Sequence, residues 1–365
     1  MAMVFRVQGT VLPSNASADV LIREGVFVSD ADPDDRVETL ATGVFITPGL
    51  VDAHAHLQIA SPVEGSAAQM AAASAREHLQ AGVLVIREPG GPAGSSTGID
   101  PDHGLPRLQT AGRFLAPEGR YIGFQRSVSG EELADAAVDE LSRSTGWAKV
   151  VMDWIDPSSV RISPNYSYDS LAAATQAVHA AGGRLAVHAA HPGSMNIAIA
   201  AGVDSIEHGL TISTDDASEM ASKGIALTPT AVGMLGVPDL MANLGAPDDE
   251  VAWWAGVVER FPATIREAHE AGVRILAGTD AGMGPHGEIR HEIAYLRAAG
   301  MPADAALAAG SWDARDYLGF PNIEIEAPAD LVAYATDPRE DPDALADPAL
   351  MVLDGRVVSY TEPLG

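Results

Sequence analysis

The sequence contains no cysteine and almost no lysine. Without cysteine the chain forms neither disulfides nor thiolate metal sites, so any metal must be held by imidazole, carboxylate or a modified amine. Among the 22 basic residues only Lys149 and Lys223 are lysines. Arginine therefore supplies nearly every surface cation, and each lysine needs its own explanation.

The chain also lacks long apolar runs and an excess of positive charge. No stretch approaches the roughly 18 apolar residues that span a bilayer, and the N-terminus lacks the pattern of a signal peptide. The net charge of -28 repels phosphate backbones and anionic membranes. A hydrophobic fraction of 47% is typical of a folded protein with a large core. We therefore expect a cytoplasmic protein that binds neither nucleic acid nor membranes.

Short β-branched strands are predicted at both ends of the chain. Segment 1–47 alternates strand-like runs with turn residues, and segment 322–365 contains a hairpin signal at Asp354 and Gly355. We expect these two segments to join into one small, discontinuous β-sandwich domain.

Between the two ends, apolar strand-like runs alternate with Ala-rich helical stretches that end at glycine. This alternation predicts an α/β fold in which residues 48–321 form a (β/α)8 TIM barrel. The eight predicted strands span residues 49–57, 82–90, 112–118, 147–154, 184–190, 203–209, 225–231 and 273–282.

Residue types that bind metals stand at the ends of several predicted strands. His54 and His56 project from the same face of the first strand, although this pair alone is equally compatible with satisfied interior histidines. His188, His208 and Asp280 end the fifth, sixth and eighth strands. Because all strands of a barrel end at one mouth, we expect these side chains to meet there and bind a divalent metal.

Lys149 lies in the apolar run AKVVMDW on the predicted fourth strand. A buried ammonium tends to lose its proton, and the neutral amine can react with CO2 to form a carbamate that bridges two cations. Arginine does not deprotonate in proteins and could not take this role. The alternative is an ordinary buried ion pair between Lys149 and Asp153.

Four segments of the chain, together with the lysine on the fourth strand, form a recognisable pattern. They are TPGLVDAHAHL, AIAAGVDSIEHG, GTDAG and APADLVAYATDP. With them the chain resembles the amidohydrolase superfamily over nearly its whole length, in particular the imidazolonepropionase-like and prolidase-like branch of metal-dependent hydrolases.

The resemblance implies a binuclear metal centre with two divalent ions, expected to be zinc. It assigns the more buried ion to His54, His56 and Asp280, the more exposed ion to His188 and His208, and the bridge to the carboxylated lysine. A metal-bridging hydroxide would attack the scissile carbonyl, and Asp280 would be the catalytic residue that carries the proton to the leaving group.

Substrate contacts are indicated less sharply. After the third strand APEGRYIGF replaces the Gly-Gly-His turn that is frequent in the family. Arginine or tyrosine near the strand ends would suit a substrate carboxylate. The candidate substrate-binding residues are Arg87, Tyr121, His191 and His286, with Arg120 and Arg126 as further arginines. The long segment 230–250 is expected either to form a lid over the substrate or to be a loop whose apolar side chains merely pack beneath it.

The predicted function is hydrolysis of an amide or peptide-like C–N bond in a small molecule, such as an N-acyl amino acid or a dipeptide. The enzymatic alternatives are a cyclic amide or imine hydrolase, of imidazolonepropionase-like or deaminase type, and a carbamate, ester or lactone hydrolase. A catalytically silent barrel used for assembly is the non-enzyme alternative, which the filled ligand positions disfavour. The sequence decides neither the substrate nor the oligomeric state, and a homo-oligomer is compatible with it.

Overall fold

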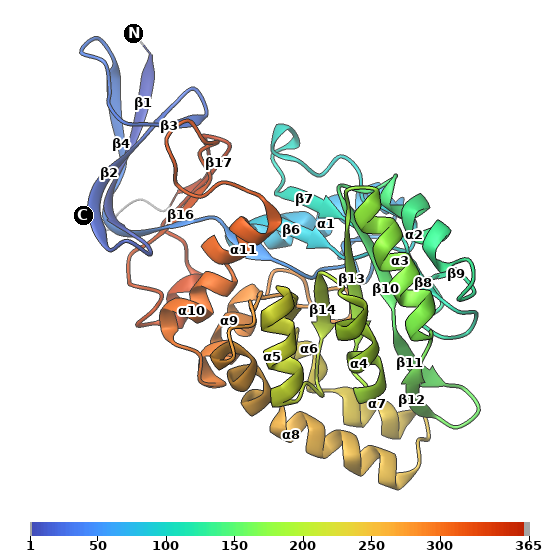
Figure 1. Ribbon diagram of the computed structural model, residues 1–365. Helices are drawn as coiled ribbons and strands as arrows, with labels where there is room; N and C mark the ends of the chain where they lie inside the picture. The colour runs from blue at the N-terminus through green and yellow to red at the C-terminus, as the bar shows by residue number, and fades with distance from the viewer. Residues whose placement is uncertain (1, 361–365) are drawn as a thin grey trace.

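Both ends of the chain contribute strands to a single sheet at one end of the molecule (Figure 1). The computed structural model describes residues 2–360. Leu331 pairs with Pro48, which joins the C-terminal strands to the N-terminal ones. In sheet order the strands are β18 (Arg356–Tyr360), β17 (Leu350–Leu353), β16 (Leu331–Tyr334), β4 (Arg36–Pro48), β1 (Met3–Val11), β2 (Ala16–Arg23) and β3 (Val26–Val28).

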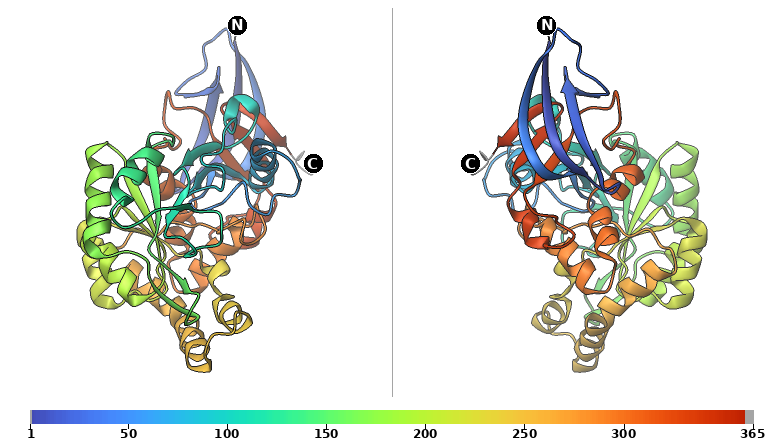
Figure 2. Two further views of the ribbon diagram at one scale, coloured as in Figure 1. Left: turned by 90° about the vertical axis from the view of Figure 1, so that its right-hand side faces the viewer. Right: turned by 90° about the vertical axis from the view of Figure 1, so that its left-hand side faces the viewer.

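This terminal sheet has an apolar core of its own. Val7, Ile46, Leu331 and Val352 are fully buried in it, although they come from both ends of the sequence. Figure 2 shows the blue N-terminal strands and the red C-terminal strands side by side, projecting from the rest of the molecule. Apolar contact as well as strand pairing therefore holds the two ends together.

Parallel strands form the centre of the remaining chain. One sheet contains, in spatial order, β15 (Ala226–Thr228), β14 (Ser205–His208), β13 (Arg184–Ala189), β10 (Trp147–Val151), β8 (Phe114–Ala116) and β9 (Arg126–Ser127). A second sheet contains, in spatial order, β5 (Leu50–Asp52), β6 (Val83–Glu88) and β7 (Arg107–Thr110). With helices between the strands, this confirms the predicted α/β class.

Segment 274–281 connects the two parallel sheets through backbone hydrogen bonds. Leu227 of β15 donates to Arg274 over 2.9 Å, and Leu276 donates back to Leu227 over 2.9 Å. On the other side Ala53 donates to Ala277 over 2.9 Å. Segment 274–281 therefore lies between β15 and β5.

The strands differ in two respects from those predicted. The eighth predicted strand forms only isolated bridges, at Ile275 and Ala281, and Asp280 within it takes a left-handed conformation with φ 56°. Beyond the prediction, the structure contains β7, β9 and the antiparallel hairpin of β11 (Asp153–Asp156) and β12 (Arg161–Pro164).

The helices lie outside the parallel strands, as Figures 1 and 2 show. Ser66 and Ser213 begin α1 and α5 with capping boxes, and Gly202 and Gly224 end α4 and α5 in left-handed conformations. The α-helices are α1 (Ala67–Gln80), α2 (Leu133–Leu141), α3 (Tyr168–Ala180), α4 (Pro192–Ala201), α5 (Thr214–Lys223), α6 (Ala231–Met234), α7 (Val237–Asn243), α8 (Asp248–Glu270), α9 (Ile289–Ala298), α10 (Ala303–Ala309) and α11 (Trp312–Leu318), and the 3-10 helices are η1 (Pro101–His103) and η2 (Pro342–Ala346).

Segment 230–250, which the sequence leaves as a lid or a packed loop, is mostly helical. It forms α6, α7 and the first residues of α8. Met241 is fully buried there, whereas Leu235 and Leu240 stay exposed. Within residues 2–360 the helices are all too short or too polar to cross a membrane.

Candidate metal centre

His54, His56 and Asp280 converge at the carboxyl end of β5. The Asp280 Oδ1 atom lies 3.1 Å from Nε2 of His54 and 3.2 Å from Nε2 of His56, and the two Nε2 atoms are 3.3 Å apart. The backbone holds this arrangement, because Asp280 donates its N–H to the His54 carbonyl over 2.8 Å. All three side chains are buried and could together hold a metal ion.

The outer nitrogens of both imidazoles are engaged elsewhere. Nδ1 of His54 lies 2.7 Å from Oε2 of Glu207, and Nδ1 of His56 lies 2.8 Å from the Gly90 carbonyl. Since both partners are acceptors, the protons reside on Nδ1, and each Nε2 presents a lone pair. Two nitrogen lone pairs and a carboxylate oxygen facing one another repel unless a cation lies among them, so these residues fit a divalent metal.

His188 and His208 bring two more imidazoles to the same place. Their ring centroids are 4.5 Å apart, and that of His208 is 5.2 Å from His54. Thr230 donates its hydroxyl to Pro229 and so accepts from Nδ1 of His208 over 2.7 Å. Nε2 of His208 is thereby free to bind a metal. Nδ1 of His188 is buried and has no hydrogen-bond partner among residues 2–360.

Lys149 is buried beside these imidazoles. Among the described residues its Nζ atom forms no hydrogen bond and no ion pair. Burial lowers its pKa to about 8, partly offset by the charge of Glu207. The alternative pairing with Asp153 is absent, because Asp153 Oδ2 accepts from the backbone of Ala190 and His191 and its Oδ1 faces His188.

Several residues at this centre adopt strained backbone conformations. His208, Thr230 and Asp280 have φ angles of 74°, 47° and 56°, in the left-handed region that residues with a Cβ atom avoid. Each such residue costs about 1–3 kcal/mol, and such strain concentrates at functional sites. At His208 the unusual φ angle also breaks the alternation of the strand, so that Glu207 and His208 both reach the centre.

The glycines of the GTDAG motif let this segment approach the histidines. A Cβ atom on Gly278 would lie 2.9 Å from the backbone nitrogen of His54, and one on Gly282 would lie 2.8 Å from the carbonyl oxygen of His56. Larger residues would push Asp280 away from the two imidazoles. The motif therefore has a packing role beside its carboxylate.

A cavity of about 230 Å³ opens beside His188, His208 and Asp280. Tyr121 and Trp154 form one wall, with ring centroids 4.8 Å apart in an edge-to-face arrangement. Of the predicted substrate-binding residues, Tyr121 lines this cavity. Burial, together with the charges of Asp280 and Asp153, raises its pKa, so the phenol stays protonated.

Arg87 does not face this cavity, contrary to the sequence prediction. Its guanidinium is fully buried and bonds to both carboxylate oxygens of Glu207, to Ala53 and to Thr228. Arg87 precedes the last residue of β6, and its side chain extends to Ala53, Glu207 and Thr228 rather than to the cavity. It is therefore a partner of Glu207 rather than a substrate contact.

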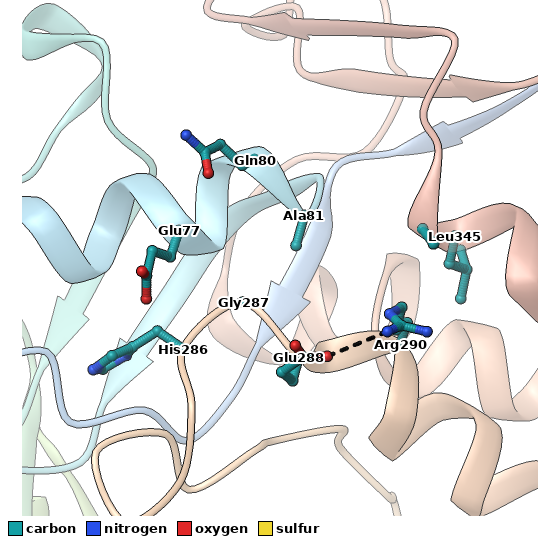
Figure 3. A pocket seen from close by; sticks show the side chains of 9 residues that line it. Glu77, Gln80, Ala81, His286, Gly287, Glu288, Arg290 and Leu345 are labelled. Atoms are coloured by element: carbon teal, nitrogen blue, oxygen red, sulfur yellow. Dashed lines mark ion pairs between the residues drawn. The ribbon is translucent and has the colours of Figure 1, made fainter. Parts of the chain in front are cut away.

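His191 and His286 also lie apart from this cavity. His191 accepts from Gly193 over 3.1 Å at the start of α4. His286 contacts His78 and the Ile59 carbonyl, and it lines a second cavity in which Figure 3 shows it near Glu77. His191 lies two residues beyond the end of β13, and His286 lies in the loop before α9, so neither position places its side chain in this cavity.

Sequence reasoning missed Glu207 and Thr230, which orient His54 and His208. The only signal was that each lies beside a strand end. Glu207 directly precedes a predicted ligand, and side chains of neighbouring strand residues normally point to opposite faces. The left-handed φ angle of His208, which brings both side chains to the same place, is visible only in the structure.

The amidohydrolase resemblance is supported by comparison with known proteins. The profile of the Amidohydrolase family matches residues 45–358. An uncharacterized protein of Mycobacterium tuberculosis and one of Mycobacterium bovis are each 37% identical to this chain over 358 residues, which is 97% of this chain and 96% of theirs.

Solved structures share the fold at lower identity. A Xaa-Pro dipeptidase with bound methionine is 22% identical, with a TM-score of 0.81 over 98% of this chain and 99% of that chain. A putative prolidase from Bifidobacterium longum is 24% identical, with a TM-score of 0.82 over 98% and 94%. The ochratoxinase of A. niger is 18% identical, with a TM-score of 0.80 over 98% and 96%. By the match of its sequence over most of its length, this chain belongs to the amidohydrolase family.

Proposed function

We propose that this protein is a metal-dependent hydrolase that cleaves an amide or peptide-like C–N bond in a small molecule. The observation that carries the proposal is the set of unshared lone pairs that face one another in a buried site. Nε2 of His54 and His56 face a carboxylate oxygen, and Nδ1 of His188 and Nζ of Lys149 are buried without a partner among the described residues. Such orphaned atoms are costly unless they bind a cation or are modified.

The proposed metal ligands follow from the directions in which these nitrogen and oxygen atoms point. His54, His56 and Asp280 would hold one divalent ion, His188 and His208 would hold a second, and a carboxylated Lys149 would supply oxygen ligands to both. Nitrogen and carboxylate donors suit zinc. When bound, the ions supply Lewis acidity to the scissile carbonyl and to the attacking water.

Asp280 is the proposed proton carrier. Its carboxylate lines the cavity, and a divalent cation held beside it would keep it ionised. It can accept the proton of the attacking water and return it to the leaving nitrogen. The protonated Tyr121 phenol in the same cavity can donate a hydrogen bond to the substrate.

We also propose the architecture that presents this site. Residues 48–321 form a (β/α)8 barrel that segment 274–281 closes, and the terminal segments 2–47 and 322–360 form a separate domain built on one seven-stranded sheet rather than the two sheets of the predicted β-sandwich. The hydrogen bonds from Leu276 to β15 and from Ala53 to Ala277 support the closure. The catalytic side chains would then lie at the carboxyl ends of the strands.

The test is the metal content and the state of Lys149 in protein purified without chelators. We expect about two equivalents of zinc, a carbamate signal in the 13C NMR spectrum after growth with labelled bicarbonate, and amide hydrolysis that depends on both. Lys149→Ala should lose the signal and the activity, whereas Lys223→Ala, at the end of α5, should keep both. One equivalent of metal, with activity indifferent to Lys149→Ala, would overturn the bridge, and no metal binding at all would overturn the function.

A further inference from the structure

The cavity beside the candidate metal centre is walled mainly by apolar and aromatic side chains. Tyr121 and Trp154 form one wall, and Met234 and Met241 contribute from the segment of α6 and α7. Leu240 lines the cavity while remaining 44% exposed. The apolar surface therefore continues from the interior to the mouth, as for a ligand with an apolar group.

No lysine or arginine of residues 2–360 lines this cavity. The guanidinium of Arg120 donates to Asn165, Asp156 and Ser163 over 2.9 Å each, and so is held against the β11 and β12 hairpin. That of Arg126 is paired with Asp139 and Glu140. Neither arginine is free to receive a substrate carboxylate.

The charged side chains nearest the cavity are acidic. Asp280 lines it, and Asp153 lies close enough for its charge to act on Tyr121. A substrate carboxylate in the apolar part would lose its hydration without gaining a cationic partner from the protein. An uncharged group loses far less on entering the same space.

We propose that the substrate is a small uncharged amide that carries an aromatic or branched aliphatic group, rather than an N-acyl amino acid or a dipeptide. The inference rests on the proposed amide hydrolysis, and it assigns selectivity to the wall formed by Tyr121, Trp154 and Met241. A cavity of about 230 Å³ has room for an apolar group of the size of a single ring or a short branched chain.

Matched amides that differ only in a carboxylate test this inference. N-acetyl-L-phenylalanine and N-(2-phenylethyl)acetamide have the same acyl group and the same ring, and only the first is charged. We expect the neutral amide to have a kcat/KM at least tenfold higher with the zinc-loaded full chain. Equal values, or a preference for N-acetyl-L-phenylalanine, would overturn the inference while leaving amide hydrolysis intact.

A binding measurement separates this inference from the proposed function. In 5-phenylpentan-2-one and 2-benzyl-4-oxopentanoate a methylene replaces the amide nitrogen, so neither can be hydrolysed at that bond. Calorimetry should show at least tenfold tighter binding of the neutral ketone. If it does while no amide is hydrolysed, the proposed function fails and the selectivity stands, whereas tighter binding of the charged ketone overturns the selectivity.

Leu240 provides a matched pair of variants for the same assay. Leu240→Arg places a cation at the partly exposed edge of the cavity, and Leu240→Gln adds polarity there without charge. Leu240→Arg should narrow the preference for the neutral amide at least threefold compared with Leu240→Gln. An unchanged ratio in both variants would show that the missing cation does not set the preference, and would overturn the inference.

Discussion

Nδ1 of His54 lies 2.7 Å from Oε2 of Glu207, and the same oxygen lies 2.6 Å from Nη2 of Arg87. One buried carboxylate is thus shared by an imidazole and a guanidinium. Although burial raises the pKa of Glu207, Arg87 together with Lys149 and His54 outweighs it and holds that pKa well below the usual value. The charged carboxylate keeps the His54 proton on Nδ1 and turns Nε2 toward Asp280.

Glu207→Gln should therefore weaken metal binding by about 10–100-fold, the range typical for loss of a group that orients a metal-binding histidine. The substitution also leaves the Arg87 charge buried without its partner, which should cost about 3–5 kcal/mol of folding free energy. Competition with a chelator of known zinc affinity measures the first effect, and thermal unfolding measures the second.

Glu219→Gln is the control for this prediction. Glu219 pairs with Lys223 on the surface of α5, and its side chain is 50% exposed, so its loss should leave metal affinity and stability nearly unchanged. Equal zinc affinity in the Glu207 and Glu219 variants would contradict the orienting role of Glu207.

Thr230 should have the corresponding role for His208. Its hydroxyl accepts from Nδ1 of His208 over 2.7 Å. Thr230→Ala should lower the affinity for the second zinc equivalent about tenfold or more, because the imidazole loses the group that fixes its proton and direction. Thr230→Ser keeps the hydroxyl and should retain most of the affinity, as metal titration by calorimetry would report. Similar losses in both variants would point to the backbone rather than the hydroxyl.

The sequence predicted which residue types gather at the metal centre better than how they are held. His54, His188 and Asp280 stand at strand ends, and convergence of parallel strands follows from the β/α alternation alone. Lys149 was conspicuous because lysine is so rare in this chain. These signals depend on composition and periodicity, which are visible without coordinates.

The interactions that support the centre could not be predicted in the same way. The contact between Arg87 and Glu207 joins side chains 120 positions apart, and nothing in either segment indicates their pairing. Arg87 was mistaken for a substrate contact because its position near a strand end does not reveal how deep a long side chain extends. The hairpin of β11 and β12 was missed because its short strands follow directly on a buried one.

Asp330 should be the main ionic contact between the terminal sheet and the rest of the chain. It accepts from Nε of Arg107 over 2.7 Å and from Nη2 of Arg315 over 3.0 Å, and both Asp330 and Arg315 are buried. Asp330→Asn should destabilise the protein by about 3–5 kcal/mol, because two arginines lose their shared counter-charge. Denaturant unfolding measures this loss. Asp19→Asn, at an exposed pair with Arg6, should change stability by less than about 0.5 kcal/mol.

Glu292 should make stability depend on pH. Its buried carboxyl group accepts from the backbone of Ala231 and Val232, but burial outweighs these bonds and raises its pKa to about 8. Between pH 4.5 and pH 8 the folded protein thus keeps a proton that the unfolded chain releases. This group therefore contributes a loss of stability as the pH rises through that window.

Glu292→Gln removes the titrating group while keeping an oxygen that can accept from the backbone of α6. We expect the difference in melting temperature, variant minus unmodified protein, to increase by about 2 °C or more when the pH is raised from 5 to 8.5. Glu259→Gln on α8 gives the baseline for loss of one carboxylate. A difference between Glu292→Gln and the unmodified protein that stays constant with pH, or shrinks as the pH rises, would contradict the raised pKa. In that case a protonated Glu292 could not be the group that accepts from the backbone of Ala231 and Val232 and so holds the start of α6 beside His208.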